Sequence, residues 1–375
     1  MIASTKTDLA AGAWSIDDRV MRLREWGSDT IRVLPQPSLL GPAEVSIGSA
    51  ETCSLPLHDP TGRVSRLHAS LVRERENNWL LRDLSSKNGV RLNGAHCSQI
   101  GLEPGDEIGI GGLTLIAESR RWIGLRGFLA RLLGWRSERF PVVDHALRSV
   151  RMAATRRAPL VLRGDGDLVP IARALHRRTL GADRPFIVCD PRRRKTTATV
   201  RSAENYETGL PAFAAATGGT LCARTLRLPK DFHSVITAFR DPNTQVRLVL
   251  CARTPEECDL YLAVPITVPP LTSRLDELDQ IITEYAEDAI AELGAPRTSF
   301  LRADRDWVRL HSASFLPDIE KATLRLVAIR ESRNLSAAAA RLGMAPVSLS
   351  RWIGRRKLPM RIDPAPSSSW GPSPG

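Results

Sequence analysis

The sequence predicts a multidomain protein with an N-terminal β-sandwich, a central α/β domain and an all-α C-terminal end. Short apolar runs separated by turn residues fill residues 29–118, which is typical of the strands of a sandwich. Apolar strands alternate with helical stretches over residues 142–270, and this alternation indicates a parallel sheet covered by helices. Helical periodicity then continues over residues 271–361. These three changes of pattern define the domain organisation.

Six apolar runs are expected to form the sandwich strands: residues 30–34, 43–47, 68–72, 78–84, 89–92 and 113–117. Residues 1–28 are predicted to be a weakly ordered N-terminal extension. Residues 119–141 are rich in Arg, Trp and Leu. We interpret them as a solvated basic amphipathic linker, and a helix that contacts a membrane or a partner is the alternative.

In the central part, strands are expected at residues 160–162, 186–188 and 247–251, and helices at 142–156 and 168–179. The helical region divides into a lid-like subdomain over residues 271–318 and a C-terminal domain over residues 319–361. The expected helices of the latter are residues 319–330, 336–342 and 347–356. Residues 362–375 consist mostly of Pro, Ser and Gly, and this composition predicts a disordered tail.

Composition narrows the functional classes. No apolar run is long enough for a transmembrane helix, and the first residues lack the pattern of a secretory signal. The six cysteines form no CxxC pair, so we expect reduced thiols, no metal site and a cytoplasmic location. Of the net charge of +12, +8 lies between Glu320 and Arg361, and such a concentration favours binding to a polyanion.

Two short motifs have the chemistry of a phosphate-binding surface: Ser65-Arg66-Leu67-His68 and Asp83-Leu84-Ser85-Ser86-Lys87-Asn88-Gly89. A phosphate group offers several strong acceptor oxygens and nearly two negative charges. A serine hydroxyl can donate to it and a guanidinium can pair with it, while an Asn amide can hold the backbone of a bound peptide.

With Ile47-Gly48, Asn93-Gly94 and Pro104-Gly105-Asp106, these motifs resemble the forkhead-associated (FHA) domain over residues 29–118. The resemblance implies binding of phosphothreonine peptides, with His68 bracing the loop that carries the serine. Ser49 stands where the family usually has an Arg that supports the phosphopeptide, and Lys87 and Arg63 are hypothesised to restore positive charge. The predicted phosphopeptide-binding residues are therefore Ser65, Arg66, Lys87, Asn88, Ser49 and Arg63.

Residues 140–325 resemble the AAA+ domain of bacterial enhancer-binding proteins, the activators of sigma-54 RNA polymerase. The matching stretches are Val169–His176, Gly218-Gly219-Thr220-Leu221, Arg247-Leu248-Val249, Asp259-Leu260-Tyr261 and 265–271. The chemistry of an ATPase is missing, because the loop Gly164-Asp165-Gly166-Asp167 has no Lys and places carboxylates where polyphosphate would bind. Arg224-Thr225 also replaces the acidic pair that would hold Mg²⁺. We therefore predict a catalytically inactive domain, and expect His176 on a helix surface.

Residues 334–353 resemble a helix-turn-helix of the Fis type, which closes the chain in enhancer-binding proteins. Ser336 is expected to cap the first helix, Gly343 to form the turn and Pro346 to begin the second helix. Four apolar residues are expected to form its small core: Leu342, Val347, Leu349 and Ile353. The second helix would enter the major groove of DNA. The predicted DNA-binding residues are Ser348, Ser350, Arg351, Arg355, Arg356 and Lys357.

Together these patterns favour a bacterial transcriptional regulator, not an enzyme, that binds a Thr-phosphorylated protein and double-stranded DNA. We expect homo-oligomers or mixed assemblies with enhancer-binding proteins. We expect no cofactor and no membrane partner. One alternative is a phosphothreonine-dependent adaptor in a kinase pathway or secretion system that does not bind DNA. The other is a residual ATPase that activates sigma-54 polymerase.

Overall fold

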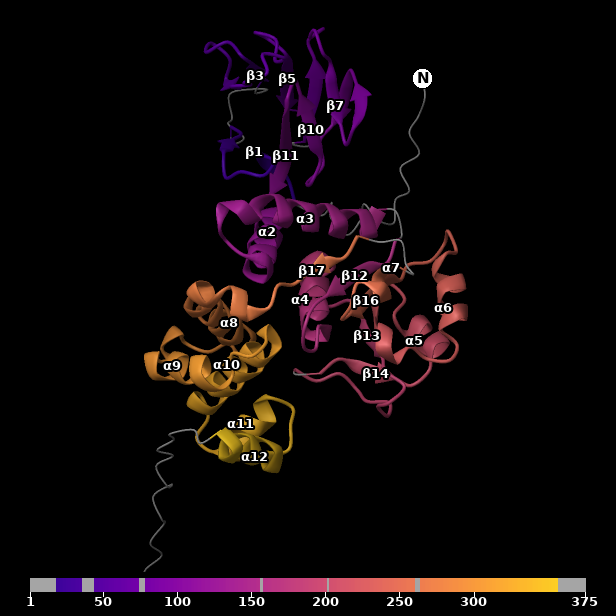
Figure 1. Ribbon diagram of the computed structural model, residues 1–375, viewed down its shortest axis with the longest axis vertical. Coiled ribbons are helices and arrows are strands. Elements are labelled where there is room, and N and C mark those ends of the chain that lie inside the picture. The colour runs from indigo at the N-terminus through magenta and orange to yellow at the C-terminus, as the bar shows by residue number, and fades with distance from the viewer. Residues whose placement is uncertain are drawn as a thin grey trace, which may run out of the picture. The chain divides into compact units, whose positions relative to one another are not determined.

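The computed structural model describes residues 18–35, 44–73, 78–155, 158–200, 202–259 and 264–356. It divides into two compact units (Figure 1). The first contains the residues up to 197 together with 203–273, and the second contains 198–202 together with the residues from 274 onward. Among the described residues, no helix combines the length and the apolar character that crossing a bilayer requires.

The N-terminal part of the first unit is a sandwich of two sheets. One sheet has the strand order β2-β1-β11-β10-β7-β8 and the other β4-β3-β5-β6-β9. Apolar side chains from both sheets, among them Leu23, Ile47, Leu71 and Ile108, form one buried core between them. The strands are β1 (Val20–Glu25), β2 (Ile31–Val33), β3 (Glu44–Gly48), β4 (Leu55–Pro56), β5 (Ala69–Arg73), β6 (Trp79–Asp83), β7 (Val90–Leu92), β8 (Ala95–Cys97), β9 (Gln99–Gly101), β10 (Glu107–Ile110) and β11 (Leu113–Ser119).

Strand β1 lies inside the stretch that was expected to be a weakly ordered extension. It pairs antiparallel with both β11 and β2 and buries Leu23 completely. The sequence pattern did not reveal the strand because Arg24, which is also completely buried, interrupts the apolar residues. The sandwich therefore begins before residue 29.

The segment expected to be a solvated linker is instead a packed helix. Helix α2 (Arg120–Leu133) buries Trp122, Leu125 and Leu129, and Ser119 caps it by accepting a hydrogen bond from the Trp122 N–H at 3.1 Å. Trp122 packs so closely on Gly105 that a Cβ there would lie 2.4 Å from the ring. The apolar stripe of this helix thus serves as core, and Arg131 is buried as well.

Helix α3 (Phe140–Thr155) is tied to the sandwich by a buried ion-pair network. The Arg24 guanidinium lies 2.7 Å from Glu118 of β11 and 2.5 Å from Asp144 of α3, and all three side chains are fully buried. Burial alone would lower the pKa of Arg24, but hydrogen bonds to Asp144 and the charges of both carboxylates raise it. The helix and the sandwich therefore share one set of buried charges.

The rest of the first unit is a parallel sheet of order β14-β13-β15-β16-β12-β17, with helices α4 to α7 (Figure 1). His176 of α4 is buried rather than on the helix surface: its Nδ1 lies 2.8 Å from Thr220 Oγ1 and its Nε2 3.0 Å from the Arg184 carbonyl. Burial lowers its pKa to about 4. The elements are β12 (Leu160–Arg163), α4 (Val169–Thr179), β13 (Phe186–Cys189), β14 (Glu204–Tyr206), α5 (Gly209–Ala215), β15 (Thr220–Arg224), α6 (Phe232–Phe239), β16 (Arg247–Ala252), α7 (Glu256–Asp259) and β17 (Ile266–Thr267).

The second unit is helical: α8 (Leu278–Leu293), α9 (Arg302–His311), α10 (Leu316–Arg330), α11 (Leu335–Arg341) and α12 (Pro346–Arg356). Trp307 of α9 packs edge-on against Trp352 of α12 with ring centroids 5.6 Å apart. Helix α11 is capped by Asn334, whose Oδ1 accepts from the Ala337 N–H at 2.9 Å, and not by Ser336. Asn334 takes this role because it, and not Ser336, has the extended backbone that a cap requires.

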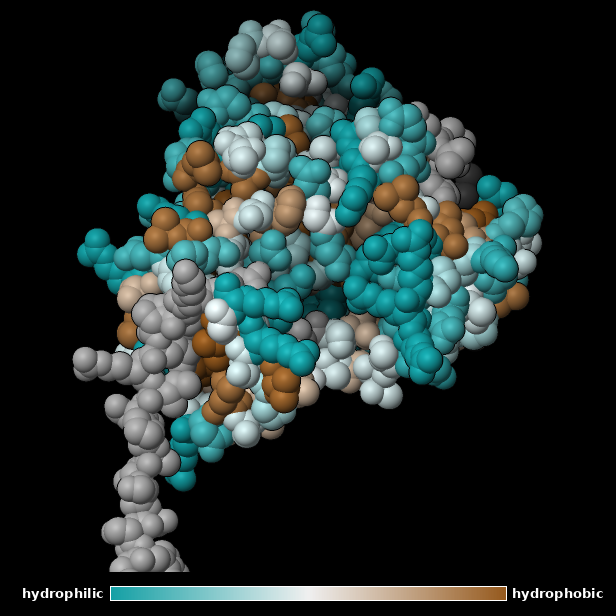
Figure 2. Space-filling model, turned by 60° about the horizontal axis from the view of Figure 1, so that its bottom comes forward, coloured by the Kyte–Doolittle hydropathy of each residue, from teal (hydrophilic) through white to brown (hydrophobic). Residues whose placement is uncertain are grey.

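The face of the molecule in Figure 2 is largely hydrophilic, with small, separated apolar areas. Scattered apolar residues of this kind are ordinary on surfaces that contact water. The candidate functional groups are therefore charged and hydrogen-bonding side chains.

Candidate functional site

Loops at one end of the sandwich bring the six predicted phosphopeptide residues together. The Lys87 N–H donates to Ser65 Oγ at 3.1 Å, and Asn88 Nδ2 donates to the Arg63 carbonyl at 2.7 Å. The Ser49 N–H donates to the Ser65 carbonyl at 3.0 Å, and the Ala50 N–H to that of Arg66 at 3.1 Å. The loops after β3, before β5 and after β6 thus form one connected surface.

The hydroxyl of Ser65 is arranged to donate. Because Ser65 Oγ accepts the Lys87 N–H, its own hydrogen remains available for another acceptor. The side chain is only half-buried, so a ligand can reach it. A phosphate oxygen is an acceptor of the required kind.

His68 holds the serine loop from below. Its ring is completely buried, and Nδ1 accepts the Ser65 N–H at 3.0 Å. Nε2 must then carry the hydrogen, and it donates to the Gly89 carbonyl at 3.2 Å. One side chain thereby connects the loops that carry Ser65 and Lys87, which is the bracing role expected for it.

Sequence reasoning missed a second brace, Asp59. Its carboxylate accepts from the backbone N–H groups of Thr61 at 2.9 Å, Arg63 at 3.0 Å and Gly112 at 3.1 Å. Hydrogen bonds, above all from the Thr61 hydroxyl, lower its pKa to about 2. The Asp59-Pro60-Thr61-Gly62 turn composition was the signal that could have found it.

The surface is cationic. Arg63, Arg66 and Lys87 are all exposed, and none forms an ion pair within the part of the chain that the structure describes. Ser49 is also exposed and its side chain is short, so its contribution to the loop arrangement is the backbone hydrogen bond. A Cβ at Gly48 would lie 2.2 Å from the Arg66 carbonyl oxygen, so glycine is needed where the arginine loop crosses β3.

Residues 45–111 match the family model of the FHA domain. Residues 45–111 form an FHA domain. No curated protein matches the chain. The match is confined to the sandwich, so it carries nothing about the residues that follow it.

Several solved FHA structures are similar to this part of the chain. The N-terminal FHA domain of S. cerevisiae Rad53p in complex with a phosphothreonine peptide is 26% identical, covers 26% of this chain and 92% of its own, and has a TM-score of 0.24. The FhaA FHA domain complexed with the intracellular domain of Rv3910 is 29% identical, covers 25% of this chain and 96% of its own, and has a TM-score of 0.22. Mycobacterium tuberculosis EmbR in complex with a low-affinity phosphopeptide is 26% identical and has a TM-score of 0.23. The match covers 26% of this chain and 24% of EmbR, so this chain spans about a quarter of EmbR. FHA homologues thus bind phosphothreonine peptides.

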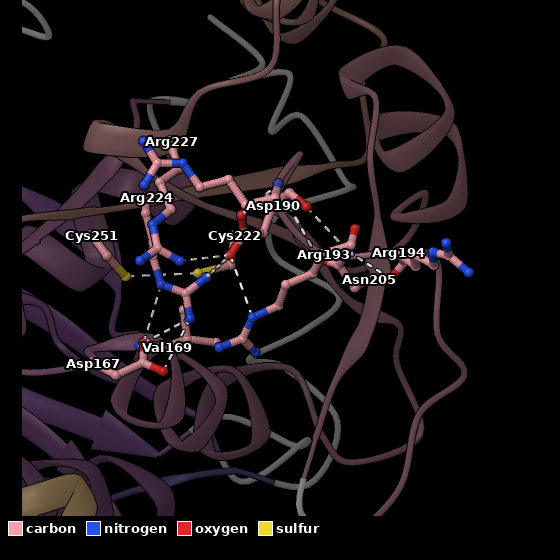
Figure 3. Close-up of polar contacts among 11 residues, drawn as sticks. Asp167, Val169, Asp190, Arg193, Arg194, Asn205, Cys222, Arg224, Arg227 and Cys251 are labelled. Atoms are coloured by element: carbon pink, nitrogen blue, oxygen red, sulfur yellow. Dashed lines mark hydrogen bonds and ion pairs between the residues drawn. The ribbon is translucent and has the colours of Figure 1, made fainter.

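A second set of polar groups lies beyond the FHA domain, at the carboxyl edge of the parallel sheet (Figure 3). Arg224, the last residue of β15, makes three hydrogen bonds to Asp167 in the loop after β12, at 2.8, 3.0 and 3.3 Å. It also lies 3.1 Å from Asp190, whose side chain is fully buried. Arg227 and Arg193 approach the same Asp190 oxygen at 3.3 and 3.6 Å.

The network involves the loop Gly164–Asp167, whose sequence predicts that it does not bind polyphosphate. The sequence suggested carboxylates that repel a polyphosphate. In the structure Asp167 is neutralised by Arg224, and the guanidinium occupies the space in front of the loop (Figure 3). Burial would lower the pKa of Arg224, but the charges of Asp167 and Asp190 raise it, so the guanidinium is charged at neutral pH.

The cysteines near this network are structural. Cys222 and Cys251 lie on adjacent strands with their sulfurs 3.8 Å apart, and both are buried. The hydrogen bond between them and their burial raise the pKa of Cys251 well above its ordinary value, and burial raises that of Cys189 to about 12. A thiol whose pKa is raised in this way is seldom deprotonated at neutral pH, and only the thiolate is a good nucleophile. Within the described ranges, no group of His, Cys, Asp or Glu is arranged to hold a metal ion.

The last two helices place four of the predicted DNA-binding residues on one exposed surface of α12: Ser348, Ser350, Arg351 and Arg355. Leu342 and Leu349 are completely buried, as expected. Val347 is not part of the core but 59% exposed, because Leu349 and Trp352 take the inward positions of α12. The side chain of Arg356, and Lys357 as a whole, lie outside the described residues.

Proposed function

We propose that this protein binds a Thr-phosphorylated protein through its FHA domain and double-stranded DNA through α11 and α12, and that it is a transcriptional regulator. The central sheet joins the two binding regions and catalyses nothing. The single observation that carries the first part is the braced Ser65 hydroxyl beside three exposed cations.

Phosphopeptide binding follows from charge and preorganisation. A phosphothreonine bound at Ser65 would accept from its hydroxyl and pair with Arg66 and Lys87. The bracing by His68 and Asp59 holds the donors before the ligand arrives, which lowers the entropy cost of binding. Lys87 and Arg63 supply the positive charge that Ser49 lacks.

The loop of the central sheet supports a non-enzymatic role. A phosphate loop needs free backbone N–H groups, a Lys and a Mg²⁺-binding hydroxyl after its strand. Here Arg224 closes the front of the loop with three hydrogen bonds to Asp167, and an incoming polyphosphate would have to break them. We therefore infer an inactive AAA+-like domain that acts as a connection or an assembly surface.

DNA binding is supported by the shape and charge of the C-terminal helices. Gly343 adopts a positive φ of 60° and forms the turn between α11 and α12. Helix α12 buries Leu349 and Trp352, so Ser348, Arg351 and Arg355 are free to contact bases and phosphates. One such unit binds weakly, so we propose that the protein acts as a dimer.

Two measurements on the full chain test the proposal. Titration with Thr-phosphorylated peptide libraries should show binding that the unphosphorylated peptides lack, and Ser65→Ala should weaken it about 10- to 100-fold, the value of a charge-assisted hydrogen bond. Ser234→Ala is the matched control, since this serine is exposed and lies in α6, outside the sandwich. Equal affinity for the phosphorylated and unphosphorylated peptides would contradict this part.

The second measurement is a gel shift with genomic duplex fragments. We expect salt-sensitive binding, and Arg351→Ala should weaken it by about 1–3 kcal/mol if the guanidinium contacts a base. Phosphopeptide binding without duplex binding would instead favour an adaptor in a kinase pathway. Turnover of ATP by the purified protein would show a residual ATPase.

A further inference from the structure

The loop that follows β13 carries four consecutive cationic residues, Arg192, Arg193, Arg194 and Lys195. All four are exposed. We propose that this basic loop, defined as residues 192–195, is a second contact surface for the phosphate backbone of duplex DNA. This inference rests on the proposed DNA binding and adds to it a site far along the chain from α12.

The backbone of the basic loop is held in one shape by buried polar groups. Asn205, which is 4% exposed, donates from Nδ2 to the carbonyls of Asp190, Arg193 and Arg194, at 3.3, 2.9 and 3.2 Å. Asp190 in turn accepts the Arg192 N–H at 3.1 Å. Two buried side chains therefore fix the loop from below; in Figure 3 the side chain of Arg194 is directed away from them, while that of Arg193 turns back toward Asp190.

Most of the charge of the basic loop is not neutralised within the described segments, and Arg193 is the exception because it pairs with Asp190. Asp167 and Asp190 already face three guanidinium groups, those of Arg224, Arg227 and Arg193. Arg192 and Arg194 have no acidic partner in the described segments. Lys195 lies over the Tyr206 ring at 4.5 Å, and its side chain is exposed. The loop therefore presents positive charge on a rigid support.

Duplex DNA is the polyanion that this arrangement fits best within the same chain. Phosphate contacts by Arg and Lys position a protein on DNA without reading sequence. A second set of contacts on a ligand already held by α12 is effectively intramolecular, and it raises the affinity without requiring strong binding of its own. Each phosphate that is neutralised also releases counterions, so the contribution appears in the salt dependence.

The test is fluorescence anisotropy of the full chain with a labelled duplex between about 50 and 200 mM salt. The variant replaces Arg192, Arg194 and Lys195 by Ala, which leaves the backbone hydrogen bonds of the loop intact. The control replaces three exposed cations elsewhere, Arg82, Lys230 and Arg240, and lowers the net charge equally.

We expect the slope of log Kobs against log[salt] to fall in magnitude by about 2–3 for the loop variant, at 0.9 per phosphate contact, with the same loss on all duplex sequences. The control should keep the wild-type slope within about 1. Arg194→Glu should weaken binding more than Arg194→Ala, because a carboxylate repels phosphate. A loss of affinity that follows the charge at one exposed position distinguishes an electrostatic effect from misfolding.

Each outcome separates the two proposals. A wild-type chain that binds duplex with a slope that the loop variant does not change overturns the basic loop and leaves the α12 proposal standing. A wild-type chain that binds no duplex overturns both. Equal losses in the loop variant and the control would reduce the effect to general charge and would likewise overturn the inference.

Discussion

Replacement of Arg224 by Ala gives the sharpest test of the ion-pair network at the carboxyl edge of the sheet. The substitution leaves Asp190 with Arg227 at 3.3 Å and Arg193 at 3.6 Å as its ion-pair partners, and with the hydrogen bond from the Arg192 N–H. Removing one partner of a buried pair costs about 3–5 kcal/mol, because the remaining charge stays desolvated. Since two weaker partners remain, we expect about 3 kcal/mol.

The other half of the interaction contributes less. Asp167 is 34% exposed, so water can solvate it once Arg224 is gone. Asp167→Asn should therefore cost no more than about 1 kcal/mol, as for surface ion pairs. Arg227→Ala is the matched control, since that side chain is 36% exposed and makes a single contact to Asp190.

Hydrogen exchange of the amides in β15 and β16 is the suitable assay, because it reports the stability of this sheet separately from the other domains. A loss of 3 kcal/mol lowers protection about 100-fold. A change of less than about threefold in Arg224→Ala would refute the reasoning, because it would mean that Asp190 is not dependent on its arginine partner.

Three further predictions follow from other parts of the chain. Burial lowers the pKa of His176 to about 4, so on acidification the unfolded chain takes up the proton before the folded chain does. The free energy of unfolding should therefore fall by up to about 3 kcal/mol as the pH drops from 6.5 to 4. Melting temperatures measured over this range should depend less on pH for His176→Gln than for the wild type, and an equal dependence would contradict the prediction. Gly105→Ala should lower the free energy of unfolding by about 2–3 kcal/mol more than Gly94→Ala, since both have positive φ but only Gly105 meets Trp122; equal melting temperatures would show that the ring moves away freely. If α12 enters the major groove, exposed Val347 should contact a thymine methyl, so uracil in place of thymine should weaken the wild type by about 1 kcal/mol and leave Val347→Ala unaffected.

The sequence predicted the elements whose pattern is strong. The strands that carry Leu71, Leu81 and Leu115 and the two C-terminal helices lie within a residue or two of their expected bounds. The FHA loops were also recognisable, because Ser65 and Asn88 sit in short motifs whose chemistry is local.

Features that depend on distant partners were not predictable. Arg24 reads as a surface residue in sequence, and only its pairing with Glu118 and Asp144 explains why it is buried in a strand. Arg224 reads as the loss of an acidic residue, while the structure gives it Asp167 as a partner far along the chain. Charges whose partners lie many residues away leave no periodic signal.

The buried triad of Arg24, Glu118 and Asp144 bears on how this FHA domain can be moved between proteins. A fragment cut after β11 would keep the arginine and the glutamate but discard the aspartate, and would leave the guanidinium without one of its two carboxylate partners. Truncation there would also uncover Gly105, against which Trp122 packs. The portable piece therefore extends through α3, and chimaeras built on the shorter boundary should aggregate where the longer ones stay monomeric.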